Sequence, residues 1–199
     1  QFASLRPVEV YIAAIPDGEM NPVLPAQRQE QIENTTHEGV KRQRYYVWKL
    51  LEIALKRSYD YEMKDLQFSR DEAGKWTCKE CYFSLSHTDG AVAVAVSRKP
   101  VGVDLERAEH TVRPGLAEKI LTEEEKNLSR EDENAFLLQM WCAKEAKFKA
   151  GCEDVFQPKK ISVLTGVRTQ TVRLGEQEYC LAVAADNLTN LRIYENILL

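Results

Sequence analysis

Two short segments carry charged side chains where the spacing of their apolar neighbours predicts a buried face. In the first, residues 101–106 (VGVDLE) alternate apolar with other side chains, which predicts a half-buried strand. Asp104 and Glu106 then lie on one face, about 7 Å apart along the strand. Two interpretations are open: a solvent-facing acidic face, or a site for a divalent cation such as Mg²⁺. Gly102 on the same face would leave room for a ligand.

The second segment, residues 141–149 (WCAKEAKFK), predicts a helix. Trp141 and Phe148 indicate a core-facing stripe, yet Lys144, Glu145 and Lys149 share it. The simpler interpretation is an exposed ion pair between Glu145 and Lys149. In the alternative interpretation, Lys144 binds a phosphate and Glu145 is a metal ligand or a general base.

Composition restricts the class of protein. The chain has 199 residues, 44% of them hydrophobic and 29% charged, with a net charge of -4. A negative charge argues against a nucleic-acid binder, and no apolar run is long enough to span a membrane. The start has no signal-peptide pattern and begins with Gln, so we expect a trimmed N-terminus. The five cysteines, an odd number, favour free thiols in a reducing compartment, hence a cytoplasmic protein.

The pattern of strands and helices repeats along the chain. The first half predicts a strand, a long helical region, a strand with a turn, and a hairpin, at residues 7–15, 27–57, 65–76 and 82–97. The second half predicts a strand, two helical segments and three strands, at residues 101–106, 114–128, 132–151, 160–164, 169–174 and 178–185. Residues 191–199 read as a last strand or as a docked tail.

This repetition predicts an α+β fold made of two similar halves, residues 1–99 and 100–199, related by a pseudo-twofold. Each half would be a small antiparallel sheet packed against a long helix.

Three further motifs have open interpretations. Arg44 lies in the apolar stripe of its helix. In the simpler interpretation its aliphatic carbons pack on the apolar surface while the guanidinium stays in water; in the other, the guanidinium binds a phosphate. Ser86 and His87 point to opposite faces of a strand and so cannot form a proton relay together. The simpler interpretation of His87 is a hydrogen-bonding role beside the turn, and phosphate or metal-water contacts are the alternative for both residues. Cys78 and Cys81 have no second ligand pair for zinc, and they precede a strand, so we interpret them as two incidental thiols.

The motifs together resemble the 4′-phosphopantetheinyl transferases of the Sfp type. That family carries a (V/I)G(V/I)D(I/L)E strand and a W-x-x-K-E-(A/S)-x-x-K helix, which match residues 101–106 and 141–149. Its GKP segment, its F-(N/S)-(I/L)-S-H-(S/T) strand and its F-(S/T)-x-x-E helix start are similar to residues 74–76, 83–88 and 121–125. Trp76 and Leu121 depart from the family's proline and aromatic residue.

The resemblance implies transfer of 4′-phosphopantetheine from coenzyme A (CoA) to a serine of an acyl or peptidyl carrier protein, releasing adenosine 3′,5′-bisphosphate. It also implies a monomer, with the active site in the cleft between the two halves. The implied ligands of Mg²⁺ or Mn²⁺ are Asp104, Glu106 and Glu145. Glu145, Lys144 and Lys149 would be the catalytic residues, with Glu145 taking the serine proton directly or through a water. The implied CoA-binding residues are Arg44, Lys75, Ser86, His87, Lys144 and Lys149.

Two other functions use the same residues. A Mg²⁺-dependent phosphohydrolase would break down a nucleotide or CoA without a carrier, and a non-catalytic module would only bind CoA. The natural carrier and its pathway, whether fatty-acid, polyketide or nonribosomal-peptide synthesis, are not specified by these motifs.

Overall fold

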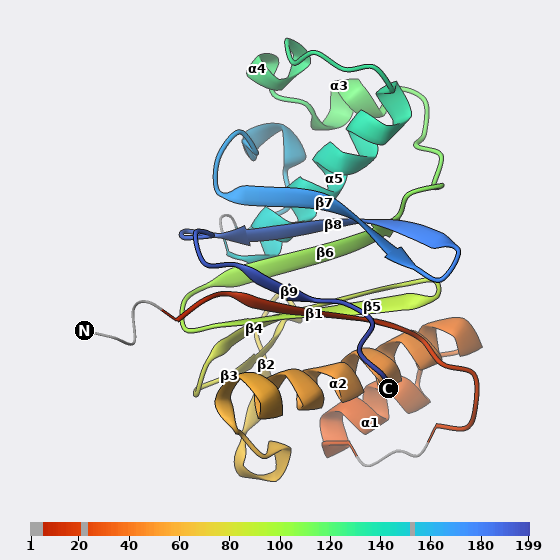
Figure 1. Cartoon of the computed structure of the whole chain (residues 1–199), viewed down its shortest axis with the longest axis vertical. Coiled ribbons are helices and arrows are strands. Elements are labelled where there is room, and N and C mark those ends of the chain that lie inside the picture. Colours follow the sequence, from red (N-terminus) through yellow and green to blue (C-terminus); the bar gives the residue numbers. More distant parts are fainter. Residues whose placement is uncertain (1–5, 21–23, 152–153) are drawn as a thin grey trace.

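The computed structural model describes residues 6–20, 24–151 and 154–199. Figure 1 shows helices α3–α5 at one end of the molecule and α1 and α2 at the other, with the strands of both large sheets between them. None of the helices in these three ranges is long and apolar enough to cross a membrane.

Within the described ranges, the N-terminal half contains two helices and five strands. Its elements are β1 (Glu9–Ala14), α1 (Ala26–Glu33), α2 (Glu38–Tyr59), a 3-10 turn (Met63–Asp65), β2 (Phe68–Arg70), β3 (Trp76–Cys78), β4 (Tyr82–Thr88) and β5 (Ala91–Ser97). The predicted hairpin over residues 82–97 is confirmed, because β4 and β5 pair in antiparallel register across the turn at Asp89 and Gly90.

The described part of the C-terminal half contains three helices and four strands. Its elements are β6 (Val101–Arg107), α3 (Leu116–Ile120), α4 (Glu123–Lys126), α5 (Glu133–Lys149), a 3-10 turn (Pro158–Lys160), β7 (Val167–Leu174), β8 (Gln177–Ala185) and β9 (Arg192–Tyr194).

The two halves share one topology. In the first, β1 pairs with β5, the second strand of the β4–β5 hairpin. In the second, β6 pairs in the same way with β8, the second strand of the β7–β8 hairpin. All four pairings are antiparallel, and each half places its long helix between the first strand and the hairpin. The predicted α+β class is confirmed, and this shared topology agrees with the prediction of two similar halves; their boundary between residues 99 and 100 stays a prediction.

The large sheets pack face to face and place helices on their outer faces. Alternation along β1 sends Val10 and Ile12 into a core shared with the second sheet, and Tyr11 and Ala13 into a core shared with α2. Strand β5 is buried along its whole length because it has a core on both faces. This stacking brings β4 and β6, one strand from each half, alongside each other.

Three predicted elements are wrong in detail. The helical region 27–57 is two helices, because the chain breaks before His37, whose imidazole accepts the Val40 N–H as the cap of α2. The region 114–128 also divides, because Thr122 and Glu125 form a capping box that starts α4. Residues 160–164 are not a strand: Lys160 ends the 3-10 turn, and residues 161–164 are irregular.

Strand β9 joins the two halves. It comes from the end of the second half but pairs in parallel with β1, from Glu9 opposite Arg192 to Tyr11 opposite Tyr194. The Tyr194 ring stacks on Tyr11 with 4.9 Å between centroids, and its hydroxyl donates to Glu9 at 2.8 Å. The C-terminal segment is therefore both a strand and a docked tail.

Candidate functional site

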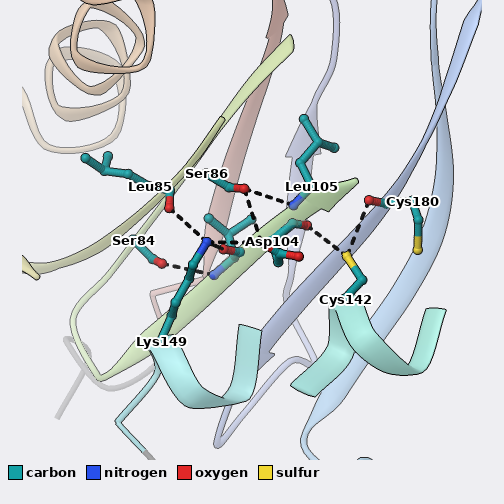
Figure 2. A network of polar contacts seen from close by, with 9 residues as sticks. Ser84, Leu85, Ser86, Asp104, Leu105, Cys142, Lys149 and Cys180 are labelled. Carbon is teal, nitrogen blue, oxygen red and sulfur yellow. Dashed lines mark hydrogen bonds and ion pairs between the residues drawn. The ribbon is translucent and has the colours of Figure 1, made fainter. Parts of the chain in front are cut away.

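The site begins where β4 meets β6, and two serine side chains make that junction. The Ser84 hydroxyl accepts the Val103 N–H at 3.1 Å, and the Ser86 hydroxyl accepts the Leu105 N–H at 3.0 Å (Figure 2). These bonds replace the backbone ladder that would satisfy the buried amides of β6. A contact of Ser86 with CoA, as predicted, would compete with this use of its oxygen, which joins the two halves.

Asp104 lies at the centre of the junction and is only half satisfied. The residue is 5% exposed. Its Oδ1 accepts the Lys149 ammonium at 3.1 Å and the Ser86 hydroxyl at 3.4 Å. Its Oδ2 is buried without a hydrogen-bond partner among the described residues. An orphaned carboxylate oxygen is costly in the folded protein, so this atom is available to a cation.

Lys149 joins the halves at the same point. Its ammonium donates to the Leu85 carbonyl of β4 at 3.2 Å and to the Val103 carbonyl of β6 at 3.1 Å, besides Asp104 (Figure 2). The positive charge therefore sits between two strands from different halves, next to a carboxylate with one free oxygen.

Two more carboxylates surround Asp104. Burial and the negative charge of Asp104 raise the pKa of Glu106 to about 8. The same two causes raise the pKa of Glu145, while the Lys149 charge opposes them. The acidic residues predicted as metal ligands thus lie near one another and are electrostatically unfavourable as they stand.

Carboxylate oxygens suit a hard divalent cation, and the orphaned Asp104 Oδ2 gives it a position to bind. No cluster of three or more acidic, histidine or cysteine side chains in the described parts of the chain forms a ready metal cage. A magnesium ion needs no such cage, because it usually takes one or two carboxylates and completes its shell with water and phosphate oxygens. The residues are compatible with Mg²⁺, and the ligand set remains a prediction.

A cavity of about 730 Å³ opens beside this cluster, bounded by α1, α2, β3, β4 and the end of α5. Its wall includes the acidic side chains of Asp71 and Asp154, and several basic ones. The basic residues of the wall are Arg28, Arg44, Lys75, His87 and Lys149. Four of these five were predicted from sequence as CoA-binding residues.

The predicted residues reach the cavity from different elements. Arg44 on α2 donates to the Thr35 hydroxyl, and Lys75 before β3 donates to the Lys149 carbonyl. His87 on β4 shares a 2.8 Å hydrogen bond between its Nδ1 and the Gln43 side chain. Burial, reinforced by nearby positive charges, lowers the pKa of His87 to about 4, so the imidazole is neutral at pH 7.

Sequence reasoning missed Arg28. Its guanidinium is 4% exposed, stacks 5.3 Å from the Trp48 ring and donates to Gln31 and to the Arg44 carbonyl. Its Nε is buried without a partner among the described residues. Burial, together with the charges of Arg44 and Arg70, lowers its pKa to about 9. A buried arginine in a cavity wall, with no acidic partner within the described structure, is suited to binding an anion.

Lys144 lies away from the cavity. It is fully buried and pairs with Glu125 at 2.7 Å. Its ammonium also donates to the carbonyls of Pro158 at 2.9 Å and Ile161 at 2.5 Å. All three ammonium protons have partners within the described structure, so the geometry does not favour the phosphate contact predicted for this residue.

Two details of the sequence interpretation need correction. A Cβ on Gly102 would lie 1.8 Å from the Ala146 carbonyl oxygen, so this glycine makes room for the backbone of α5 and not for a ligand. The face of α5 that meets the sheet is made of small residues such as Cys142 and Ala146, whereas Trp141 and Phe148 are half-buried against Phe156. The stripe marked by Trp141 and Phe148 therefore lies beside the face of α5 that packs on the sheet.

Comparison with known proteins finds a match in the second half. Residues 100–191 match the model of the 4′-phosphopantetheinyl transferase superfamily. Over 114 residues the chain is 27% identical to a 4′-phosphopantetheinyl transferase, gsp, of Aneurinibacillus migulanus. That match covers 55% of this chain and 48% of the relative, so the chain aligns with about half of that protein. The resemblance inferred from the motifs is confirmed.

Proposed function

From residues 100–191, which carry the 4′-phosphopantetheinyl transferase superfamily match, we propose that this chain transfers 4′-phosphopantetheine from CoA to a serine of a carrier protein. The observation that carries the proposal is the continuity of the basic cavity with the carboxylate cluster, because Lys149 belongs to both.

The basic cavity supports CoA as the donor. CoA carries a 3′-phosphate and a pyrophosphate, and both need positive partners. Arg28, Arg44 and Lys75 would hold the 3′-phosphate end, with neutral His87 as a hydrogen-bonding group. Lys149 would lie closest to the pyrophosphate, because its ammonium is next to Asp104.

The carboxylates support a divalent cation at the pyrophosphate. Asp104, through its free Oδ2, Glu106 and Glu145 would hold Mg²⁺, with Mn²⁺ as a substitute. The ion would supply Lewis-acid charge stabilisation for the pyrophosphate.

In the reaction, the serine oxygen of the carrier attacks the phosphorus that bears the pantetheine arm, and the bond from that phosphorus to the bridging oxygen breaks. Adenosine 3′,5′-bisphosphate leaves with the bridging oxygen. Glu145 takes the serine proton, a role helped by the raised pKa of its half-buried carboxylate. Lys149 offsets the negative charge that grows on the leaving side.

The carrier protein is expected to approach with an acidic surface. Two basic groups on this chain would attract it electrostatically, residues 41–44 on α2 and the lysines at 159 and 160.

The direct test is to incubate the protein with CoA, Mg²⁺ and several apo carrier proteins, and to weigh each carrier by mass spectrometry. We expect a phosphopantetheine adduct on at least one of them. CoA breakdown without an adduct would identify a phosphohydrolase, and CoA binding without turnover would identify a binding module.

Glu145→Gln tests the proposed base. Carrier modification should fall by at least about a hundredfold, whereas CoA affinity measured without Mg²⁺ should change little, because Glu145 is not among the described residues of the cavity wall. Glu176→Gln, an exposed change in the β7–β8 turn, is the matched control. Full activity in Glu145→Gln would exclude Glu145 as the base.

A further inference from the structure

Two cysteines in the wall of the basic cavity have no part in the chemistry proposed so far. Cys78 is the last residue of β3, and Cys81 immediately precedes β4. Their sulfur atoms lie 3.9 Å apart, and both residues line the cavity. Cys78 is half-buried and Cys81 is buried, so a small reagent reaches Cys78 first.

The segment between them can accommodate a disulfide. Only Lys79 and Glu80 separate the cysteines, and both are exposed in a bend that belongs to no sheet. A disulfide requires the sulfurs to approach to about 2.05 Å. The two sulfurs therefore have to move nearly two ångströms closer, and the bend has to change shape to allow this. Arg98 donates a 2.9 Å hydrogen bond to the Glu80 carbonyl in that bend.

We propose that Cys78 and Cys81 form a reversible disulfide, and that closing it weakens anion binding in the adjoining cavity. The oxidant would be a low-molecular-weight disulfide. The Cys78 thiolate attacks one of its sulfurs, giving a mixed disulfide and releasing one thiolate. Cys81 then loses its proton to solvent and attacks the Cys78 sulfur, which releases the second thiolate. The protein gives up two electrons and two protons, and the small disulfide becomes two thiols.

The electrostatics of the pair agree with this order of attack. The hydrogen bond from the Cys81 thiol, with backbone hydrogen bonds from Cys81 and Glu80, lowers the pKa of Cys78 to about 7 against the effect of burial. The same hydrogen bond and burial raise the pKa of Cys81. Cys78 is thus the attacking sulfur near neutral pH, and Cys81 resolves the mixed disulfide.

Strand β3 connects the cysteines to the cavity wall. It has three residues, so a shift at Cys78 reaches Trp76 and the adjoining Lys75. Trp76 packs 5.1 Å from the Trp48 ring, and Lys75 donates to the Lys149 carbonyl. Displacing Lys75 would remove a positive charge from the proposed position of the CoA phosphates, and this consequence rests on the proposed function.

The test treats the full chain with oxidised or reduced glutathione near neutral pH. Peptide-level mass spectrometry after alkylation should find a Cys78–Cys81 disulfide that dithiothreitol reverses. The internal control is Cys142, whose sulfur donates to the Cys180 carbonyl at 3.5 Å but which is fully buried; it should stay reduced. In Cys81→Ser, a glutathione adduct should accumulate on Cys78.

Calorimetry of CoA binding provides the second readout. Oxidation should raise the Kd about tenfold, equivalent to about 1.4 kcal/mol. In Cys78→Ser the ratio of oxidised to reduced Kd should be one. The proposal would be overturned if Cys78 and Cys81 stayed reduced, or if the Kd of the wild-type protein for CoA were the same before and after their oxidation. A reduced protein that binds no CoA would instead overturn the proposed function, while the thiol map would still decide the disulfide chemistry.

Discussion

Helix α5 carries two lysines that each pair with a carboxylate, and the two pairs differ in what they leave unsatisfied. Lys144 and Glu125 are both fully buried, and each has further hydrogen bonds: Glu125 also accepts the backbone N–H groups of Thr122 and Val163. Lys149 lies in the wall of a cavity, and its partner Asp104 keeps one oxygen without a described partner.

The difference separates two uses of buried charge. A pair whose donors and acceptors are all satisfied holds segments together: Lys144 and Glu125 connect α4 and α5 to the 3-10 turn and to the residues that follow it. A pair with a free acceptor leaves the site incomplete until a ligand arrives. Similar residues in the sequence thus divide into an anchoring pair and a binding pair.

The largest expected effect comes from breaking the anchoring pair. Glu125→Ala should lower the free energy of unfolding by about 3–5 kcal/mol, because it leaves the Lys144 ammonium buried without its counter-charge. Urea unfolding measures the loss. Glu123→Ala on the same helix removes only an exposed ion pair and should stay within about 0.5 kcal/mol. A loss below about 1 kcal/mol in Glu125→Ala would contradict the anchoring role.

Asp104→Asn tests the binding pair. Carrier modification should fall at least about a hundredfold, because the amide keeps the size of the side chain but removes the charge next to the proposed cation. The rate of adduct formation at saturating CoA measures this. Asp89→Asn, which alters an exposed partner of Arg107, should leave the rate unchanged. A decrease of less than about threefold in Asp104→Asn would place the cation elsewhere.

Ser84→Ala probes the junction that holds the binding pair in place. The change orphans the buried Val103 N–H and should cost about 1–3 kcal/mol of unfolding free energy. Ser69→Ala, which removes an exposed hydroxyl pair with Thr77, is the control and should have almost no effect. Equal stabilities for the two variants would mean that water serves the Val103 amide as well as Ser84 does.

The smallest effect concerns pH. Folding lowers the pKa of His87 from its ordinary value of 6.5 to about 4, so the unfolded chain binds the extra proton between these values. Its contribution to stability is complete above pH 6.5 and falls as the pH drops towards 4. Between about pH 7 and 5.5 the loss should be about 1 kcal/mol, and His87→Gln should abolish that part of the pH dependence. An unchanged slope in urea unfolding would show that other groups cause it.

Local patterns predicted the elements whose signals are local. The β4–β5 hairpin and strand β6 were identified because alternation and a turn lie within a few residues of each other. The break before His37 lies within residues 33–39, which carry no apolar side chain, so apolar spacing does not locate it and only the cap reveals it. The strand predicted at residues 160–164 failed because a short apolar run does not distinguish a strand from a segment packed on a helix.

The residues of the site also divide into those that the sequence predicted and those that it did not. The cavity residues Arg44, Lys75, His87 and Lys149 were found through motifs. The partner of Lys144 was not, because Glu125 meets it only through tertiary folding and nothing in the spacing distinguishes it from its acidic neighbours. Arg28 was also missed: it stands in a polar stretch that reads as a solvated surface, and only the packing of α1 on α2 buries it.

Strand β9 has a consequence for how the chain reaches this structure. β1 cannot gain its outer neighbour until residues 192–194 have been made, so one sheet edge stays open throughout synthesis of the second half. Pairing over such a separation is slow because a long loop must close first. Meanwhile the main-chain groups on that edge of β1 can recruit strands from other nascent chains, which makes this edge the point where misassembly would start.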